Sequence, residues 1–76
     1  MKSKKIKGLL DMMGVKYQTY QNKGTYIYVE SLLEDDEAMW QIDFVDGVGY
    51  NHDTNEVVNY KLLAQIKFHN NLAEQE

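Results

Sequence analysis

The sequence predicts a small single α+β domain over residues 1–76, with a helix, an antiparallel four-stranded sheet and a C-terminal helix. Three observations support this fold class. Apolar residues recur at helical spacing near both ends of the chain, apolar and polar residues alternate between them, and the links between alternating segments are short. Short links favour antiparallel strands, and we expect both helices to cover one face of the sheet.

The first helix is expected over residues 3–13, where apolar residues form a single stripe. Ser3 can accept a backbone hydrogen bond as the N-cap residue. Gly14 can adopt the left-handed conformation that commonly ends a helix. The apolar stripe consists of Ile6, Leu9, Leu10 and Met13.

A β-hairpin is expected over residues 15–30, because both arms are rich in β-branched and aromatic residues and residues 22–24 form a turn sequence. A three-residue loop pairs Gln21 with Thr25. The pairs that follow are Tyr20–Tyr26, Tyr17–Val29 and Lys16–Glu30. One face then holds Val15, Tyr17, Thr19, Ile27 and Val29. The other holds Lys16, Gln18, Tyr20, Tyr26, Tyr28 and Glu30.

Residues 31–37 are expected to connect this hairpin to a third strand over residues 39–45. In that strand Trp40, Ile42 and Phe44 point to one side, and we expect them to form the centre of the core.

The segment after the third strand permits several structures. Residues 46–49 contain two glycines and suit either a tight turn or a bend within a longer strand. Residues 52–55 are turn formers, so residues 56–60 would become a fourth strand paired with the third, followed by a helix over residues 61–73. The alternative is a three-stranded sheet and a longer helix that begins at Asp53.

Composition excludes several classes of protein. The chain has no Cys, which rules out disulfides and thiolate chemistry and favours a reducing, cytoplasmic compartment. No segment approaches the roughly 20 apolar residues of a membrane-spanning helix, so no membrane partner is expected. Arg and Pro are also absent, a composition typical of AT-rich bacterial genomes and their phages.

Motifs for catalysis or cofactor binding are missing from the sequence. Neither Ser3 nor Ser31 lies in a nucleophile elbow, and no phosphate-binding loop is present. His52 and His69 form no close zinc pair, and we expect His52 to be a solvated turn residue. The sequence therefore predicts a non-enzymatic protein with no cofactor.

A calcium site is not expected either. The carboxylates that flank the glycine-containing segment are Asp43, Asp46 and Asp53. When Gly47 is placed at the sixth loop position, hydrophobic residues fall at the first and third positions, where carboxylates are required. The sequence therefore predicts no metal ligands.

Charge is strongly segregated along the chain, which has a net charge of −4. Residues 30–56 contain nine acids and no Lys, whereas residues 1–16 have a net charge of +4. The N-terminal lysines are the only route to nucleic acid, and no aromatic residue lies among them. We therefore expect no direct nucleic-acid partner other than through these lysines.

Two sets of residues are candidates for binding a partner. The acidic set consists of Glu34, Asp35, Asp36, Glu37, Asp43 and Asp46. The aromatic set consists of Tyr20, Tyr26 and Tyr28. Carboxylates on a rigid scaffold can imitate a row of phosphates, and Tyr is enriched at interfaces. The alternatives are a merely solubilising acidic loop and tyrosines that only stabilise the hairpin.

The functional hypothesis is a protein-binding module whose acidic surface covers a basic, nucleic-acid-binding site of a larger partner. Such a module would act as a phage or mobile-element inhibitor of a host or defence enzyme. The alternative is a structural or regulatory homodimer that uses either the tyrosines or the second helix, where Phe68 and Leu72 could make the contact.

Overall fold

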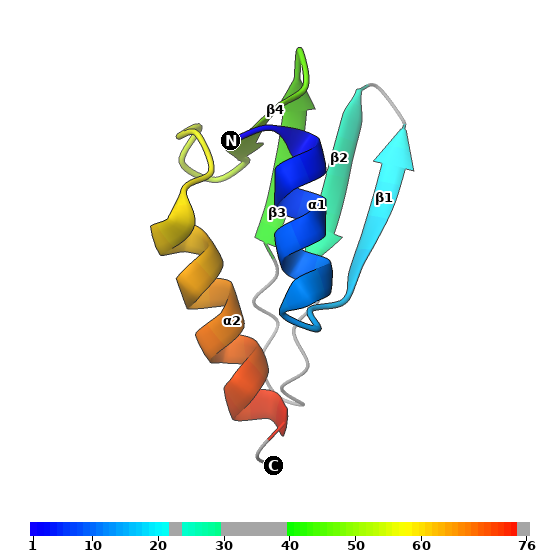
Figure 1. Cartoon of the computed structure of the whole chain (residues 1–76). Coiled ribbons are helices and arrows are strands. Elements are labelled where there is room, and N and C mark those ends of the chain that lie inside the picture. Colours follow the sequence, from blue (N-terminus) through cyan, green and yellow to red (C-terminus); the bar gives the residue numbers. More distant parts are fainter. Residues whose placement is uncertain (22–23, 30–39, 75–76) are drawn as a thin grey trace.

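The computed structural model describes residues 1–21, 24–29 and 40–74, and it confirms the α+β class. Four antiparallel strands form a sheet in the order β1-β2-β3-β4, and α1 lies across one face of it (Figure 1). The expected connection at residues 31–37 lies outside the described residues. The elements are α1 (Ser3–Met12), β1 (Tyr17–Gln21), β2 (Thr25–Val29), β3 (Trp40–Val45), β4 (Val48–Asn51) and α2 (Tyr60–Glu74).

Helix α1 ends at the predicted glycine. Gly14 has a positive φ of 71°, and its N–H donates to the Asp11 carbonyl at 3.1 Å. The N–H of Val15 donates to the Leu10 carbonyl at 2.9 Å. These two bonds satisfy carbonyls that the end of a helix leaves unpaired, as in the Schellman motif.

The expected N-cap of α1 is wrong. Lys2 occupies that position in an extended conformation with no side-chain cap, and Ser3 is already helical. The backbone explains the difference, because Lys2 bridges to Val48 of β4 and the Ser3 N–H donates to the Gly47 carbonyl at 2.8 Å. The start of the chain is therefore held by the edge of the sheet rather than by a capping side chain.

The expected β1–β2 register is confirmed in every described pair. Residue Gln21 lies opposite Thr25, as a three-residue loop requires. The expected pair of Lys16 and Glu30 lies partly outside the described residues. The remaining pairs are Tyr17–Val29, Gln18–Tyr28, Thr19–Ile27 and Tyr20–Tyr26.

The fourth strand is Val48–Asn51, so the expectation of a strand at residues 56–60 is wrong. Asp46 and Gly47 have φ values of 52° and 79°. The residues that flank them, Val45 and Val48, pair with each other across β3 and β4. Two consecutive positive φ values define a two-residue turn whose twist matches that of the flanking strands. The tight turn therefore returns the chain beside β3 at once.

Residues 52–59 contain a second turn and lead into α2. The predicted turn at residues 52–55 is present, and Asn55 has the left-handed φ of 61° that its side chain tolerates. Only an isolated bridge joins Val57 to β4. The Asn59 side chain accepts a hydrogen bond from the Leu62 N–H at 3.0 Å. This cap starts α2 at Tyr60, which also excludes a helix beginning at Asp53.

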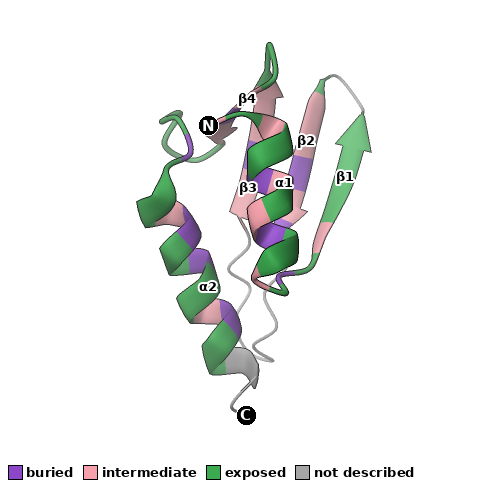
Figure 2. Ribbon diagram, viewed as in Figure 1, coloured by how far each residue is buried: buried purple, intermediate pink, exposed green. Residues whose placement is uncertain are grey.

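Both helices bury their apolar sides against the same face of the sheet (Figure 2). Ile42 lies at the centre of this core, as expected, whereas Trp40 and Phe44 are only half-buried at its margins. Trp40 makes an edge contact with His69 of α2, with 5.1 Å between ring centroids. The buried cluster consists of Ile6, Leu10, Val15, Ile27, Val29, Ile42, Val58, Leu63 and Ile66.

Gly49 allows α1 to lie close to β4. A Cβ at this position would overlap the Ile6 side chain and lie 3.2 Å from side-chain atoms of both Ile42 and Phe44. The absence of a side chain therefore sets the distance between helix and sheet where Ile6 is completely buried.

We expect Gly49→Ala to lower the free energy of unfolding by about 1–3 kcal/mol, because overpacking forces α1 away from β4. The matched control is Gly8→Ala within α1, where an added Cβ has no neighbour within 4 Å. That change should stabilise the protein by about 0.5–1 kcal/mol. Urea denaturation measures both, and two stabilising substitutions would show that the contact at Gly49 is not tight.

Candidate functional site

The face of the sheet opposite the helices, here called the open face, carries the candidate site. Strand alternation places one set of side chains toward the core and the other set on this face. Neither described helix covers the open face, because both helices bury their apolar residues against the opposite face of the sheet. The open face holds Gln18, Tyr20, Tyr26, Tyr28, Gln41, Asp43, Val45, Val48 and Tyr50.

Three tyrosines form a compact group on the open face, here called the tyrosine cluster. Tyr20 of β1 stacks on Tyr26 of β2, with ring centroids 5.3 Å apart and an interplanar angle of 16°. Tyr28 meets the edges of both rings, at centroid distances of 5.4 Å and 5.3 Å. Each ring thus contacts the other two, which restricts their rotation and gives the face a stiff aromatic surface.

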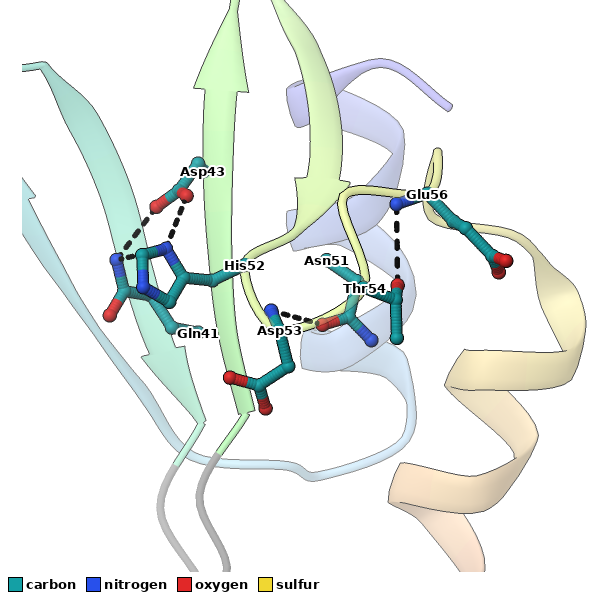
Figure 3. A network of polar contacts seen from close by, with 7 residues as sticks. All are labelled: Gln41, Asp43, Asn51, His52, Asp53, Thr54 and Glu56. Atoms are coloured by element: carbon teal, nitrogen blue, oxygen red, sulfur yellow. Dashed lines mark hydrogen bonds and ion pairs between the residues drawn. The ribbon is translucent and has the colours of Figure 1, made fainter.

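A polar network lies beside the tyrosine cluster, on β3 and the end of β4 (Figure 3). Gln41 Nε2 donates to Asp43 Oδ1 at 2.7 Å, and His52 Nδ1 lies 2.7 Å from Asp43 Oδ2. Both oxygens of the carboxylate therefore accept a bond. The 3.3 Å between Gln41 Nε2 and His52 Nδ1 is then a contact between two donors rather than a hydrogen bond.

The network joins the tyrosine cluster through the pairing of the strands. Asp43 lies between Tyr26 of β2 and Tyr50 of β4, and Gln41 lies beside Tyr28. The His52 N–H donates to the Gln41 carbonyl at 3.0 Å, which extends the β3–β4 pairing by one residue. The aromatic and polar groups therefore form one continuous surface across all four strands.

The Asp43 carboxylate raises the pKa of His52 above its ordinary value of 6.5. The hydrogen bond to Asp43 is the largest cause, and the negative charge of Asp43 is the second. Asp53 adds a smaller attraction in the same direction, against a small opposing effect of desolvation. The imidazolium form is therefore favoured next to a carboxylate that remains in contact with solvent.

Lys5 and Lys7 of α1 lie on the helical side of the molecule. Lys5 lies over the ring of Tyr60 at 5.2 Å from its centroid, and Lys7 lies 5.5 Å from the centroid of Phe44. The residues of β1, β2, β3 and β4 include no Lys at all. The described strands therefore carry no Lys, although strand alternation places Lys16, directly before β1, on the same side as Gln18.

The candidate binding residues are only partly brought together. Tyr20, Tyr26, Tyr28 and Asp43 share the open face, whereas Asp46 lies in the β3–β4 turn at its edge. The other four acidic candidates lie outside the described residues. These are Glu34, Asp35, Asp36 and Glu37.

Sequence reasoning did not place Gln41, Tyr50 and His52 in the site. His52 is an exposed turn residue, as expected, with its side chain 53% exposed, but the sequence did not indicate that its imidazole bonds to Asp43. The missed signal is the Asp-Gly pair at residues 46–47, the sequence most typical of a two-residue hairpin turn. Counting back from this turn pairs Asp43 with Tyr50 and brings His52 beside Gln41.

The described side chains of the open face offer aromatic rings, an amide, a carboxylate and an imidazole. An Asp–His pair can hold a proton, but a catalytic role also requires a positioned nucleophile or a second acid–base group. Among the described residues, no three His, Cys, Asp or Glu side chains are grouped so that they could hold a metal ion. Of the described helices, none combines the length and apolar character that crossing a bilayer requires.

No family model matches this chain, and comparisons with curated proteins and with solved structures found no match. The function must therefore be argued from the residues of the open face and from their surroundings.

We expect the Asp43–His52 pair to stabilise the fold in a pH-dependent way. Because the pKa of His52 is raised in the folded state, this stabilisation is present below pH 6.5 and is lost as the pH rises through the folded pKa. The difference in unfolding free energy between the wild type and His52→Gln should therefore be larger at pH 5.5 than at pH 8.5. Chemical denaturation at the two pH values measures this difference.

An NMR titration of His52 provides the control. Asp43→Asn should return the pKa of His52 toward 6.5, whereas Asp53→Asn should change it less. Equal effects of the two substitutions would contradict the assigned hydrogen bond.

We expect the ring of Tyr20, rather than its hydroxyl, to stabilise the hairpin. Tyr20→Ser should lower the unfolding free energy by about 0.5–1.5 kcal/mol, because both aromatic contacts are lost. Tyr20→Phe removes only the 2.6 Å bond to the exposed Gln18 side chain and should cost less. Thermal denaturation measures both variants, and equal losses would assign the stabilisation to the hydroxyl.

Proposed function

We propose that this protein is a non-enzymatic binding module whose open face covers a basic surface on a larger protein. The observation that carries the proposal is the tyrosine cluster beside the Asp43 carboxylate, each oxygen of which accepts a hydrogen bond. The described strands of this sheet contain no Lys. Tyr combines a large apolar ring with a polar hydroxyl and loses little conformational entropy on binding.

The tyrosine cluster suits recognition of lysine and arginine side chains. Aromatic faces attract cations, and the Asp43 carboxylate adds a longer-range attraction at pH values where His52 is neutral. The packed rings already restrict one another, so a partner would meet a surface that is largely preorganised. Asp46 in the β3–β4 turn would extend the negative charge at the edge of this surface.

The arrangement favours a protein partner over a nucleic acid. Stacking of bases on tyrosines would require cationic side chains along the same surface to follow the phosphates. The described lysines of α1 lie instead on the helical side of the sheet, away from the tyrosine cluster. A nucleic acid on the open face would meet Asp43 without those lysines.

We further propose that the bound surface is a nucleic-acid-binding site and that the protein acts as an inhibitor of its owner. This is the role of a phage or mobile-element protein directed at a host or defence enzyme. A chain without Cys suits the reducing cytoplasm in which such a target would act.

Capture of a partner from a lysate of the native host tests the proposal. The immobilised wild type should retain a basic protein at low salt and release it as salt screens the contact. Two variants should each weaken capture by about tenfold or more, because they replace negative charge with positive charge, which a basic partner repels. They are Asp43→Lys and the triple charge reversal of Asp35, Asp36 and Glu37 to Lys.

The matched control is Lys4→Glu on the exposed side of α1, which should leave capture unchanged. Circular dichroism would show whether each variant remains folded. Full capture by both charge-reversed variants would reject the proposal, and loss of capture only in Lys4→Glu would assign binding to the helical side.

A further inference from the structure

Asp43 is the only charged residue in the four strands of the sheet. Its carboxylate lies on the open face, where Gln41 Nε2 donates to one oxygen and His52 Nδ1 donates to the other, both at 2.7 Å. The Asp43 side chain is 34% exposed and the His52 side chain is 53% exposed, so a bound partner can contact both groups. The protonation state of this pair therefore decides whether the strands present a negative charge.

The hydrogen bond to Asp43 determines where His52 takes up a further proton. A neutral imidazole has a single N–H, and the nitrogen that donates to a carboxylate is the one that carries it. Nδ1 is that nitrogen, because it lies 2.7 Å from Asp43 Oδ2. A second proton therefore binds at Nε2, which leaves the bond to Asp43 in place and converts the ring into a cation.

The groups around the pair were compared for charges that could offset this change. The titratable side chains nearest to it along the strands and the following turn are Tyr26 and Tyr28 of β2, Tyr50 of β4 and Asp53. Asp53 favours the imidazolium form, in the same direction as Asp43. Lys16 lies on the same side directly before β1, so β2 separates it from β3. Among the described residues, the proton on His52 is therefore the closest positive charge to the Asp43 carboxylate.

We propose that protonation of His52 weakens the binding of a basic partner to the open face, so that the Asp43–His52 pair is a pH-sensitive switch. The switch rests on the proposed function, because it regulates the same surface. At high pH the pair carries one negative charge, which adds to the attraction of the tyrosine cluster for cations. At low pH the imidazolium cancels this charge and repels the lysines of a partner.

The pKa of His52 sets the pH at which the switch operates. The hydrogen bond to Asp43 and then its charge raise this pKa above the ordinary value of 6.5. Binding should therefore be weak below pH 6.5 and become stronger as the pH rises through the raised pKa. Because linkage is reciprocal, a bound basic partner must in turn lower the pKa of His52.

Titration with a labelled oligolysine peptide at pH 5.5 and at pH 8.5 tests the proposal. The peptide keeps its charge over this range, because the pKa of a lysine side chain is about 10.4. Ionic strength is held constant, since salt screens the contact. The affinity of the wild type should rise about fivefold between the two pH values, the effect of one unit charge about 4 Å away in water. Fluorescence anisotropy measures the dissociation constant at each pH.

Three variants identify the group responsible. His52→Gln should remove most of the pH dependence, because an amide does not take up the proton. Asp43→Asn should move the midpoint of the remaining change back toward pH 6.5. The matched control is His69→Gln on α2, where the ring contacts Trp40 on the helical side, and this variant should keep the pH dependence of the wild type. Circular dichroism at both pH values would show whether each variant remains folded.

An NMR titration of the wild type gives a measurement that needs no substitution. The pKa of His52 should be lower in the presence of saturating oligolysine than in its absence. An unchanged pKa would show that the peptide binds away from the pair and would overturn the proposal.

The other outcomes distinguish the switch from the function on which it rests. Equal affinity at the two pH values, or a pH dependence that His52→Gln retains in full, would overturn the switch alone. Absence of oligolysine binding at both pH values would overturn the switch together with the attraction of the open face for basic surfaces.

Discussion

The two-residue turn at Asp46 and Gly47 sets how β3 pairs with β4. Both residues have positive φ, a conformation that Gly adopts freely and Asp tolerates. The turn allows only one pairing of β3 with β4, because a shift of one residue would exchange the two faces. That pairing places Gly49 beneath α1 and Tyr50 beside Asp43.

The β3–β4 register has a different consequence on each face of the sheet. On the core side, Gly49 leaves room for Ile6, so α1 packs on the same hydrophobic cluster that α2 covers. On the open face, the register brings His52 to the carboxylate of Asp43, which Gln41 also contacts. A single turn thus determines both the depth of helix packing and the assembly of the polar network, although neither involves the turn's own side chains.

The parts of the fold that could be predicted from the sequence depend on local patterns. The stripe containing Ile6 and Leu10, the stop at Gly14 and the β1–β2 register each follow from spacing within a few residues. The fourth strand was misplaced because residues 56–60 and 48–51 both have strand-like composition. Only the Asp-Gly pair at residues 46–47 distinguishes them, because it is typical of a two-residue turn after which the returning strand begins at Val48.

The candidate site, like the fold, could be predicted only where it depends on local patterns. The grouping of the three tyrosines follows from the hairpin register alone, so it could be anticipated. The contact of His52 with Asp43 depends on pairing between two strands whose junction the sequence leaves open between a tight turn and a bend. Non-local contacts of this kind become predictable only after the turn is assigned.

Helix α2 carries apolar residues on two sides, and only one of these sides packs in the core. Its sequence has no single apolar stripe, since Leu63 and Ile66 occupy one side and Tyr60 and Phe68 occupy the other. An isolated domain needs only one apolar side per helix to complete its core. The structure shows that the first pair completes this core, so the second pair has no role in it. The conflict in the pattern therefore arises because α2 carries apolar residues on an exposed side in addition to those that pack in the core.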